Sequence, residues 1–144
     1  MSREKFRAVV KGIVTRDEKV LIGRKEEIEG HPISGQWHLM GGHLEHGETL
    51  DQAIKREIKE ETNLDVEVSE LIESSTFAWD ENDELNSIQF VFHCKPNGGT
   101  AKAKEDLEKV KWVDVSKIIN KLDSMEANRV KRSQKQTEFF SKLS

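Results

Sequence analysis

The sequence predicts a mixed β-sheet with helices packed on it, or an α+β arrangement of the same elements. The order of the segments is the first observation, because stretches typical of strands both precede and follow the clearest helix. Length is the second, since 144 residues suit one domain with a real core. We therefore expect a single domain over residues 1–144.

The first part of the chain predicts a hairpin over residues 5–24. Apolar residues hold alternate positions on both sides of a polar turn at 16–19. A polar loop is expected over 25–36, and 37–40 is a short strand candidate. Residues 41–48 then form a glycine-containing loop that leads into a helix.

The helix is predicted over residues 49–62. Thr49 can cap its N-terminus, with Gln52 at the capping-box position. Asn63 follows the last turn, where a left-handed residue is expected and Asn is tolerated. The helix therefore has recognisable signals at both ends.

Three carboxylates continue the apolar stripe of this helix. Successive residues rotate by about 100° around a helix. The inward stripe is expected to consist of Leu50, Ala53 and Ile54, and the solvated face of Lys55, Lys59 and Thr62. One turn farther along, the inward stripe continues with Glu57, Glu60 and Glu61. Like charges at this spacing repel, so partial burial would require protons or a cation. Hard oxygen ligands suit Mg²⁺ or Mn²⁺, although a charged surface helix is the alternative interpretation.

The residues before the helix add to the metal interpretation. Gly41 and Gly42 would let backbone groups approach a ligand closely, and a helix N-terminus favours anions. A phosphate-bearing substrate could lie there, with a metal bridging it to the glutamates.

The second half of the chain predicts further strands, a short helix and a basic tail. The expected elements are strands at 66–79 and 85–95 around an acidic turn at 80–84, a loop at 96–101, a strand at 110–113, and a helix capped by Ser116 that runs through 119. The tail 128–144 is basic before Phe139 and Phe140, which suggest docking on this chain or on a partner in a homodimer. RNA contact by the tail is the alternative.

Residues 42–64 read GHLEHGETLDQAIKREIKEETNL. This segment resembles the Nudix box, G-x5-E-x7-R-E-U-x-E-E-x-G-U, in which U is apolar. Asn63 replaces the second glycine of the pattern, and Met40 stands where the family usually has proline. The resemblance extends over most of the chain, but only the box is diagnostic.

The Nudix resemblance implies an α/β/α sandwich around a mixed sheet, and hydrolysis of a nucleoside diphosphate linked to another moiety. The implied cofactor is Mg²⁺, with Mn²⁺ as a substitute. The metal ligands carried over are Glu57, Glu60, Glu61 and the carbonyl of Gly41. Glu48 and Arg56 would form an ion pair that orients the helix.

Other roles rest on position in the chain. A late-loop glutamate is common in the family, and Glu105 is the candidate, with Asp106 and Glu108 as rivals. Glu57 and Glu105 both remain candidates for the general base. The substrate-contact candidates are Arg24 and Lys25 for phosphates, Trp79 for base stacking, and His43.

The substrate is inferred by elimination. Related enzymes that cleave dinucleoside polyphosphates tend to have a tyrosine after the box, and this chain has no tyrosine. Enzymes that cleave ADP-ribose tend to have a proline beyond the box, and the only prolines here, Pro32 and Pro96, do not stand at that position. A MutT-like nucleoside triphosphate pyrophosphohydrolase, releasing a monophosphate and pyrophosphate, is the expectation. The alternatives are an ADP-ribose or nucleotide-sugar pyrophosphatase, and a non-catalytic nucleotide-binding module.

Composition excludes several other classes. The net charge of −4 argues against nucleic acid as the partner and leaves a small nucleotide. No apolar run approaches the length of a membrane span, so we expect a soluble, cytoplasmic protein. Cys94 is the single cysteine and is expected in the core rather than as a nucleophile.

Overall fold

A computed structural model describes residues 5–25, 37–77, 85–104, 107–118 and 134–143. Within these ranges the chain forms seven strands and two long helices, and residues 115–118 are also helical. In chain order the elements are β1 (Lys5–Arg16), β2 (Lys19–Lys25), β3 (Trp37–His38), β4 (Met40–His43), α1 (Leu50–Thr62), β5 (Asp65–Phe77), β6 (Leu85–Gly98), β7 (Leu107–Asp114) and α3 (Gln134–Leu143).

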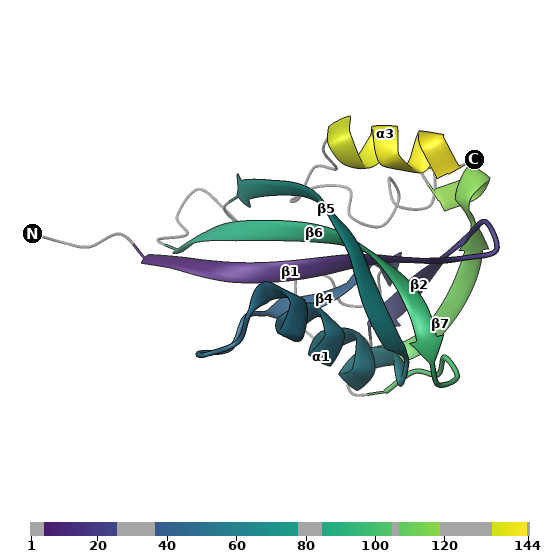
Figure 1. Ribbon diagram of the computed structural model, residues 1–144, viewed down its shortest axis with the longest axis horizontal. Helices are drawn as coiled ribbons and strands as arrows, with labels where there is room; N and C mark the ends of the chain where they lie inside the picture. Colours follow the sequence, from purple (N-terminus) through teal and green to yellow (C-terminus); the bar gives the residue numbers. More distant parts are fainter. Residues whose placement is uncertain (1–4, 26–36, 78–84, 105–106, 119–133, 144) are drawn as a thin grey trace, which may run out of the picture.

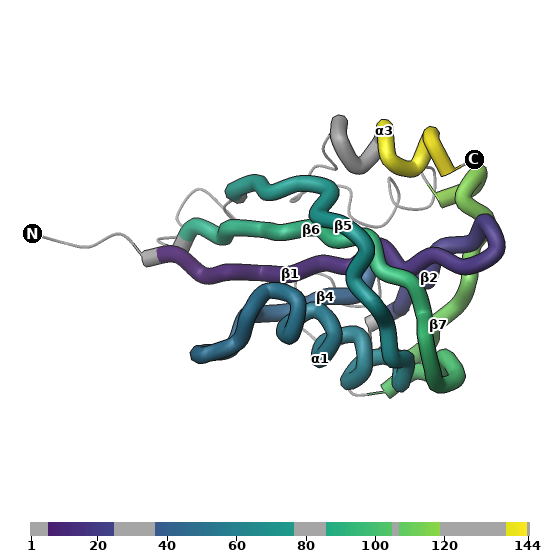
Figure 2. Tube along the Cα trace, in the orientation of Figure 1, coloured from purple at the N-terminus to yellow at the C-terminus, as the bar shows by residue number. Residues whose placement is uncertain are grey.

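Strand β1 is the strand on which the sheet is built. It pairs in parallel with β6 over its length and antiparallel with β4 on its other side, and its end turns into β2. Strand β5 extends the sheet beyond β6, while β3 and β7 both pair with β2. The sheet is therefore mixed, as the sequence predicts. Figure 2 shows β1, β6 and β5 following one another across it.

The two helices pack on opposite faces of the sheet (Figure 1). Side chains alternate along a strand, so one strand serves both faces. Val10 and Val14 of β1 join the core under α1, whereas Ile13 between them joins the core that contains Phe140 of α3. This arrangement of layers confirms the α/β/α sandwich, and the docking of Phe140 within the same chain is one of the two expected outcomes for the tail.

Two predictions near the paired glycines need correction. The expected strand 37–40 is divided into β3 and β4, and Gly41 and Gly42 lie in β4 rather than in a loop. The reason is pairing with β1, where Lys11 is opposite Gly41 and Val10 is opposite Gly42. A sequence window of a few residues does not show a partner that lies 30 positions earlier.

The second half of the chain also differs from the prediction in its boundaries. Strand β6 runs through Pro96 to Gly98, because Asp65 and Val66 of β5 pair with these residues beyond the point where the pairing of β6 with β1 ends. Strand β7 is longer than 110–113, and the helix at 115–118 begins one residue before Ser116. The predicted turn at 80–84 and the tail up to 133 lie outside the described residues.

Both ends of α1 are as predicted. Gln52 donates its backbone N–H to the hydroxyl of Thr49, and its side chain accepts the N–H of Thr49, which completes a capping box. Asn63 ends the helix in the left-handed conformation, with φ of 66°. Thr62, expected on the solvated face, is instead fully buried. Backbone N–H groups of Lys102 and Lys104 bond to the last turn of the helix and cover it.

Within the described residues, no helix combines the length and apolar character that crossing a membrane requires. Cys94 is fully buried in the core beneath α1, which confirms its predicted place there. Burial raises the pKa of the thiol to about 12. The thiolate form is therefore scarce at neutral pH.

We predict that Cys94 does not react with a thiol reagent such as DTNB while the protein is folded. At pH 8, labelling of the native protein is expected to be at least about 100-fold slower than labelling in urea, because only the thiolate attacks. Absorbance of the released product measures both rates. Fast labelling of a protein whose melting temperature is normal would contradict this burial.

Candidate functional site

Strand β4 lies against α1 at the two glycines. A methyl group in place of the Gly42 hydrogen would overlap the carboxylate of Glu57, so the strand backbone and this side chain are in direct contact. The backbone N–H of Gly41 donates to Oε1 of Glu61 at 3.0 Å, and the Glu61 side chain is nearly buried. The glycine pair therefore places two of the three helix glutamates beside one short stretch of backbone.

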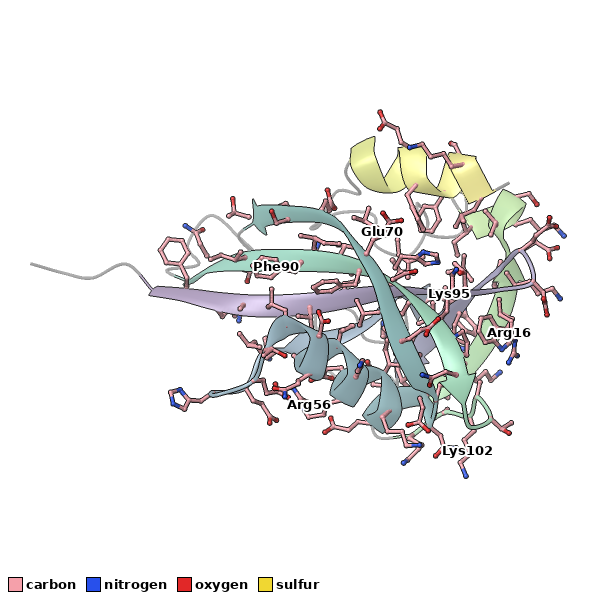
Figure 3. All side chains as sticks on the ribbon, in the orientation of Figure 1. Arg16, Arg56, Glu70, Phe90, Lys95 and Lys102 are labelled. Atoms are coloured by element: carbon pink, nitrogen blue, oxygen red, sulfur yellow. The ribbon has the colours of Figure 1, made fainter. Side chains whose placement is uncertain are left out.

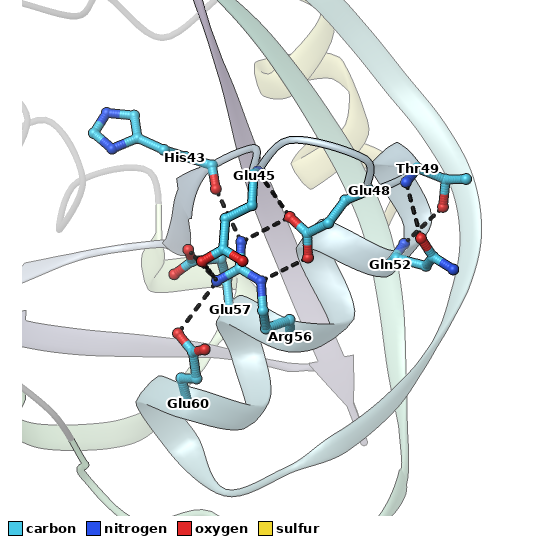
Figure 4. A network of polar contacts seen from close by, with 8 residues as sticks. All are labelled: His43, Glu45, Glu48, Thr49, Gln52, Arg56, Glu57 and Glu60. Atoms are coloured by element: carbon cyan, nitrogen blue, oxygen red, sulfur yellow. Dashed lines mark hydrogen bonds and ion pairs between the residues drawn. The ribbon is translucent and has the colours of Figure 1, made fainter.

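Arg56 connects α1 to the turn that precedes it (Figure 4). Its Nε donates to Oε2 of Glu48 at 2.6 Å, and its Nη2 donates to Oε1 of the same carboxylate at 2.9 Å. Two parallel bonds of this kind fix both distance and orientation. Nη2 also donates to the carbonyl of His43 at 3.0 Å. The ion pair implied by the Nudix resemblance is thus present.

The remaining nitrogen of Arg56 faces the helix glutamates. Nη1 donates to Oε1 of Glu57 at 2.9 Å and to Oε2 of Glu60 at 3.3 Å. Glu45 also lies within ion-pair distance, with its Oε1 3.6 Å from Nη1. One guanidinium therefore contacts two glutamates of the helix and two glutamates of the loop that precedes it.

The electrostatics follow from these contacts. The hydrogen bond from Arg56 holds the pKa of Glu48 below its ordinary value, and the same bond raises the pKa of Arg56. The pKa of Glu57 is raised, mainly by burial and against the opposing effect of Arg56. Burial thus makes Glu57 more basic than an exposed glutamate.

The donor set of this site suits a hard divalent cation, since it consists of carboxylate oxygens and the nearby backbone of β4. Among the described residues, however, no group of three or more His, Cys, Asp or Glu side chains is arranged to hold a metal ion. Glu57 and Glu60 are turned toward Arg56, and Glu61 is turned toward the N–H of Gly41. The chemistry of the residues fits a metal, and binding one would require these carboxylates to reorient.

The structure describes only some of the other site candidates. Arg24 lies in β2, and its Nη1 is 3.8 Å from Oε2 of Glu108. The Arg24 side chain is therefore engaged in an ion pair with a residue of the neighbouring strand β7. His43 is exposed, and its ring extends away from the glutamates (Figure 4). Lys25 ends β2, and its backbone is paired with Leu107 of β7. Three candidates lie outside the described residues: Trp79, Glu105 and Asp106.

Two contacts were not anticipated from the sequence. Glu45 joins the Arg56 network, and its place three residues before Glu48 in the same turn is a signal that could have indicated it. Lys111 of β7 lies over the ring of Trp37 at 4.4 Å. No local sequence signal joins these two residues, because β3 and β7 are brought near each other by their pairing with β2.

Comparison with known proteins identifies the family. The model of the NUDIX domain matches residues 5–135. An ADP-ribose pyrophosphatase of Methanocaldococcus jannaschii is 33% identical over 109 residues, which cover 76% of this chain and 62% of that relative. A nucleoside triphosphatase NudI of Enterobacter sp. (strain 638) is 31% identical over 109 residues, which cover 70% of this chain and 77% of that protein.

The fold has counterparts among solved structures. A MutT NUDIX hydrolase from Burkholderia pseudomallei superposes with a TM-score of 0.71 at 18% identity, and the match covers 98% of this chain and 100% of that one. At this identity the likeness concerns the fold. The match of the NUDIX domain model to residues 5–135 shows that this chain belongs to the NUDIX domain family.

Proposed function

We propose that this protein hydrolyses a nucleoside diphosphate linked to another group, with a divalent metal held by Glu57, Glu60, Glu61 and the carbonyl of Gly41. The observation that supports the proposal is the contact of β4 with α1, which sets the side chains of Glu57 and Glu61 beside the backbone of Gly41 and Gly42. Mg²⁺ is the proposed ion, and Mn²⁺ is expected to substitute for it.

The bound ion would neutralise the charge of the diphosphate bridge and lower the pKa of the attacking water. The residues of the chain supply the rest. Arg56, through its two hydrogen bonds to Glu48, holds the turn before α1 in a fixed position relative to the helix. Glu57 is the described carboxylate best suited to accept the proton of the water, because burial raises its pKa. Glu105 stays a candidate for the same role.

A nucleoside triphosphate is the proposed substrate, cleaved to a monophosphate and pyrophosphate. The name of the Enterobacter relative, a nucleoside triphosphatase, supports it. The second candidate is ADP-ribose or a nucleotide sugar, and the name of the Methanocaldococcus relative favours this one. A module that binds nucleotides without turnover is disfavoured, since binding alone does not require three clustered glutamates.

The proposal predicts that purified protein with Mg²⁺ releases monophosphate and pyrophosphate from at least one triphosphate. Chromatography of products from a panel of NTPs, dNTPs, ADP-ribose and nucleotide sugars measures this. Glu60→Gln is expected to lower kcat by about 100-fold or more, because it removes a charged metal ligand. Glu67→Gln, on an exposed residue of β5, is the matched control and should remain near wild type.

If only ADP-ribose or a nucleotide sugar is cleaved, the proposed hydrolysis would stand, but the proposed triphosphate substrate would be wrong. No turnover with either Mg²⁺ or Mn²⁺ would reject the enzymatic proposal in favour of a binding module. Activity of Glu60→Gln equal to that of Glu67→Gln would remove Glu60 from the metal site.

We also predict that Gly42→Ala lowers kcat by about 100-fold, because the added methyl group must displace the Glu57 carboxylate. Gly98→Ala provides the control, since its methyl group would meet the side chain of Asp65, whose nearest atom, Oδ2, is 3.2 Å away. Steady-state kinetics and melting temperatures are measured for both variants. A folded Gly42→Ala protein with full activity would show that the position of Glu57 is unimportant.

The Arg56–Glu48 pair predicts a pH-dependent stability. The pKa of Glu48 is lowered from 4.5 in the folded state, so its stabilising contribution is complete above about pH 4.5 and is lost as pH falls through the lower folded value. Wild type should therefore melt at a higher temperature than Glu48→Gln at pH 7. This difference should shrink between pH 5 and pH 3. A difference that stays constant over this range would contradict the ion pair's contribution.

A further inference from the structure

A histidine lies in the core between the sheet and the C-terminal helix α3. His93 of β6 is only 7% exposed, although an imidazole is the side chain that titrates near neutral pH. It is paired with Ile13 of β1, which belongs to the core that contains Phe140 of α3. Residues directly opposite each other in neighbouring strands point to the same face. His93 is therefore part of the surface on which α3 docks.

Helix α3 contacts this histidine directly. The ring of Phe139 packs edge-on against the ring of His93, with 4.9 Å between the ring centroids and 62° between the ring planes. Phe139 also lies edge-on to Phe140, which is 1% exposed and packs in the same core. The two phenylalanines thus cover the imidazole and hold the helix on the sheet through one continuous set of contacts.

The polar contact of the imidazole suits its neutral form. Nε2 of His93 lies 2.7 Å from the hydroxyl oxygen of Thr15 on β1. A hydroxyl can donate to a ring nitrogen or accept from it, so the bond forms with either neutral tautomer. Protonation would place a positive charge against Phe139 without giving it a carboxylate in hydrogen-bond contact with Nε2. Burial is accordingly the main reason that the pKa of His93 is lowered.

The charges around His93 act on its pKa in opposite directions. Lys95, two residues later on β6, lowers the pKa, whereas Glu70, directly opposite on β5, raises it. Figure 3 shows Glu70 on the side of the sheet that carries α3. Glu70 is exposed, so water screens its charge and burial outweighs it. Further charged residues flank this region: Lys11 on β1 and Glu73 on β5, which both pair with Val91, Lys117 in the helical residues 115–118, and Glu138 and Lys142 on α3.

We propose that His93 makes the docking of α3 depend on pH: the helix is held while the imidazole is neutral and is released when the imidazole takes up a proton. Once α3 has left, water reaches the ring and solvates its charge, so the open form binds the proton more tightly than the closed form. The state that binds a proton more tightly is favoured as pH falls. Phe139 and His93 lie on the opposite side of the sheet from the glutamates of α1, so the switch is independent of the proposed hydrolysis.

The direction and size of the effect follow from one titrating group. In the open form the exposed ring is expected to have its ordinary pKa of 6.5, and in the closed form the pKa of His93 is lower. Docking of α3 is therefore at full strength above about pH 6.5 and weakens as pH falls from there through the closed-form value. A single proton changes the docking constant by at most about 10-fold per pH unit within this window.

Hydrogen exchange of the full chain tests the proposal. Exchange of the α3 and α1 amides is followed by mass spectrometry from pH 7.5 to pH 5.0, and the rates are corrected for the intrinsic effect of pH. Protection of α3 should fall by about 10-fold or more over this range. At pH 5.0 the α3 amides should exchange faster than those of α1, because α3 opens while the sheet stays folded. Equal protection of both helices at pH 5.0 would show that α3 opens only on global unfolding, which would contradict the proposal.

Two variants separate His93 from the other titrating groups. His93→Gln removes the titrating ring and keeps a polar side chain that can bond to Thr15, so protection of α3 should be nearly the same at pH 5.0 and pH 7.5. His46→Gln makes the same change at an exposed histidine before α1 and should behave like wild type. If folded His93→Gln loses as much α3 protection as wild type, His93 is not the switch.

A second measurement decides the matter if His93→Gln does not fold. The pKa of His93 is measured by NMR from its ring-proton shifts in wild type and in Phe139→Ala, which removes the ring that α3 places against the imidazole. Because linkage is reciprocal, loss of this contact should raise the pKa of His93 toward 6.5. An identical pKa in both proteins would overturn the proposal, since docking of α3 would then have no influence on protonation.

Discussion

The paired hydrogen bonds between Arg56 and Glu48 are the interaction on which the candidate site depends. They tie the turn before α1 to the middle of the helix, and the carbonyl of His43 ties the end of β4 to the same guanidinium. Without this cation, carboxylates at positions 48, 57 and 60 would repel one another at the helix surface. Arg56 therefore both fixes the backbone and offsets the charge that the site accumulates.

Close approach of backbone to helix is the second constraint. A methyl group at Gly12 would meet Cδ1 of Ile58 at 2.9 Å, and one at Gly42 would overlap Glu57. Two neighbouring strands thus lack side chains where α1 crosses them. The helix can then lie near enough for its apolar residues to fill the core and for its glutamates to reach the strand backbone. Packing and the geometry of the site are consequences of the same two glycines.

The parts predicted correctly from the sequence are those encoded locally. The capping box at Thr49 and the left-handed Asn63 involve residues within a few positions of each other, so a short window contains the whole signal. The burial of Thr62 was missed because Lys102 and Lys104 arrive from 40 positions away. The glycine pair was misassigned to a loop for the same reason, since its strand character comes from pairing with β1.

The same distinction separates the reaction from the choice of substrate. The glutamates and Arg56 lie within one helix and the turn before it, so a single motif identifies them. Groups that select a substrate need not lie within that motif, and residues of different strands, such as those at positions 9, 43 and 89, become neighbours only through sheet pairing. Relatives with nearly equal identity to this chain have names that specify different substrates. Membership of the family therefore does not by itself select among these substrates.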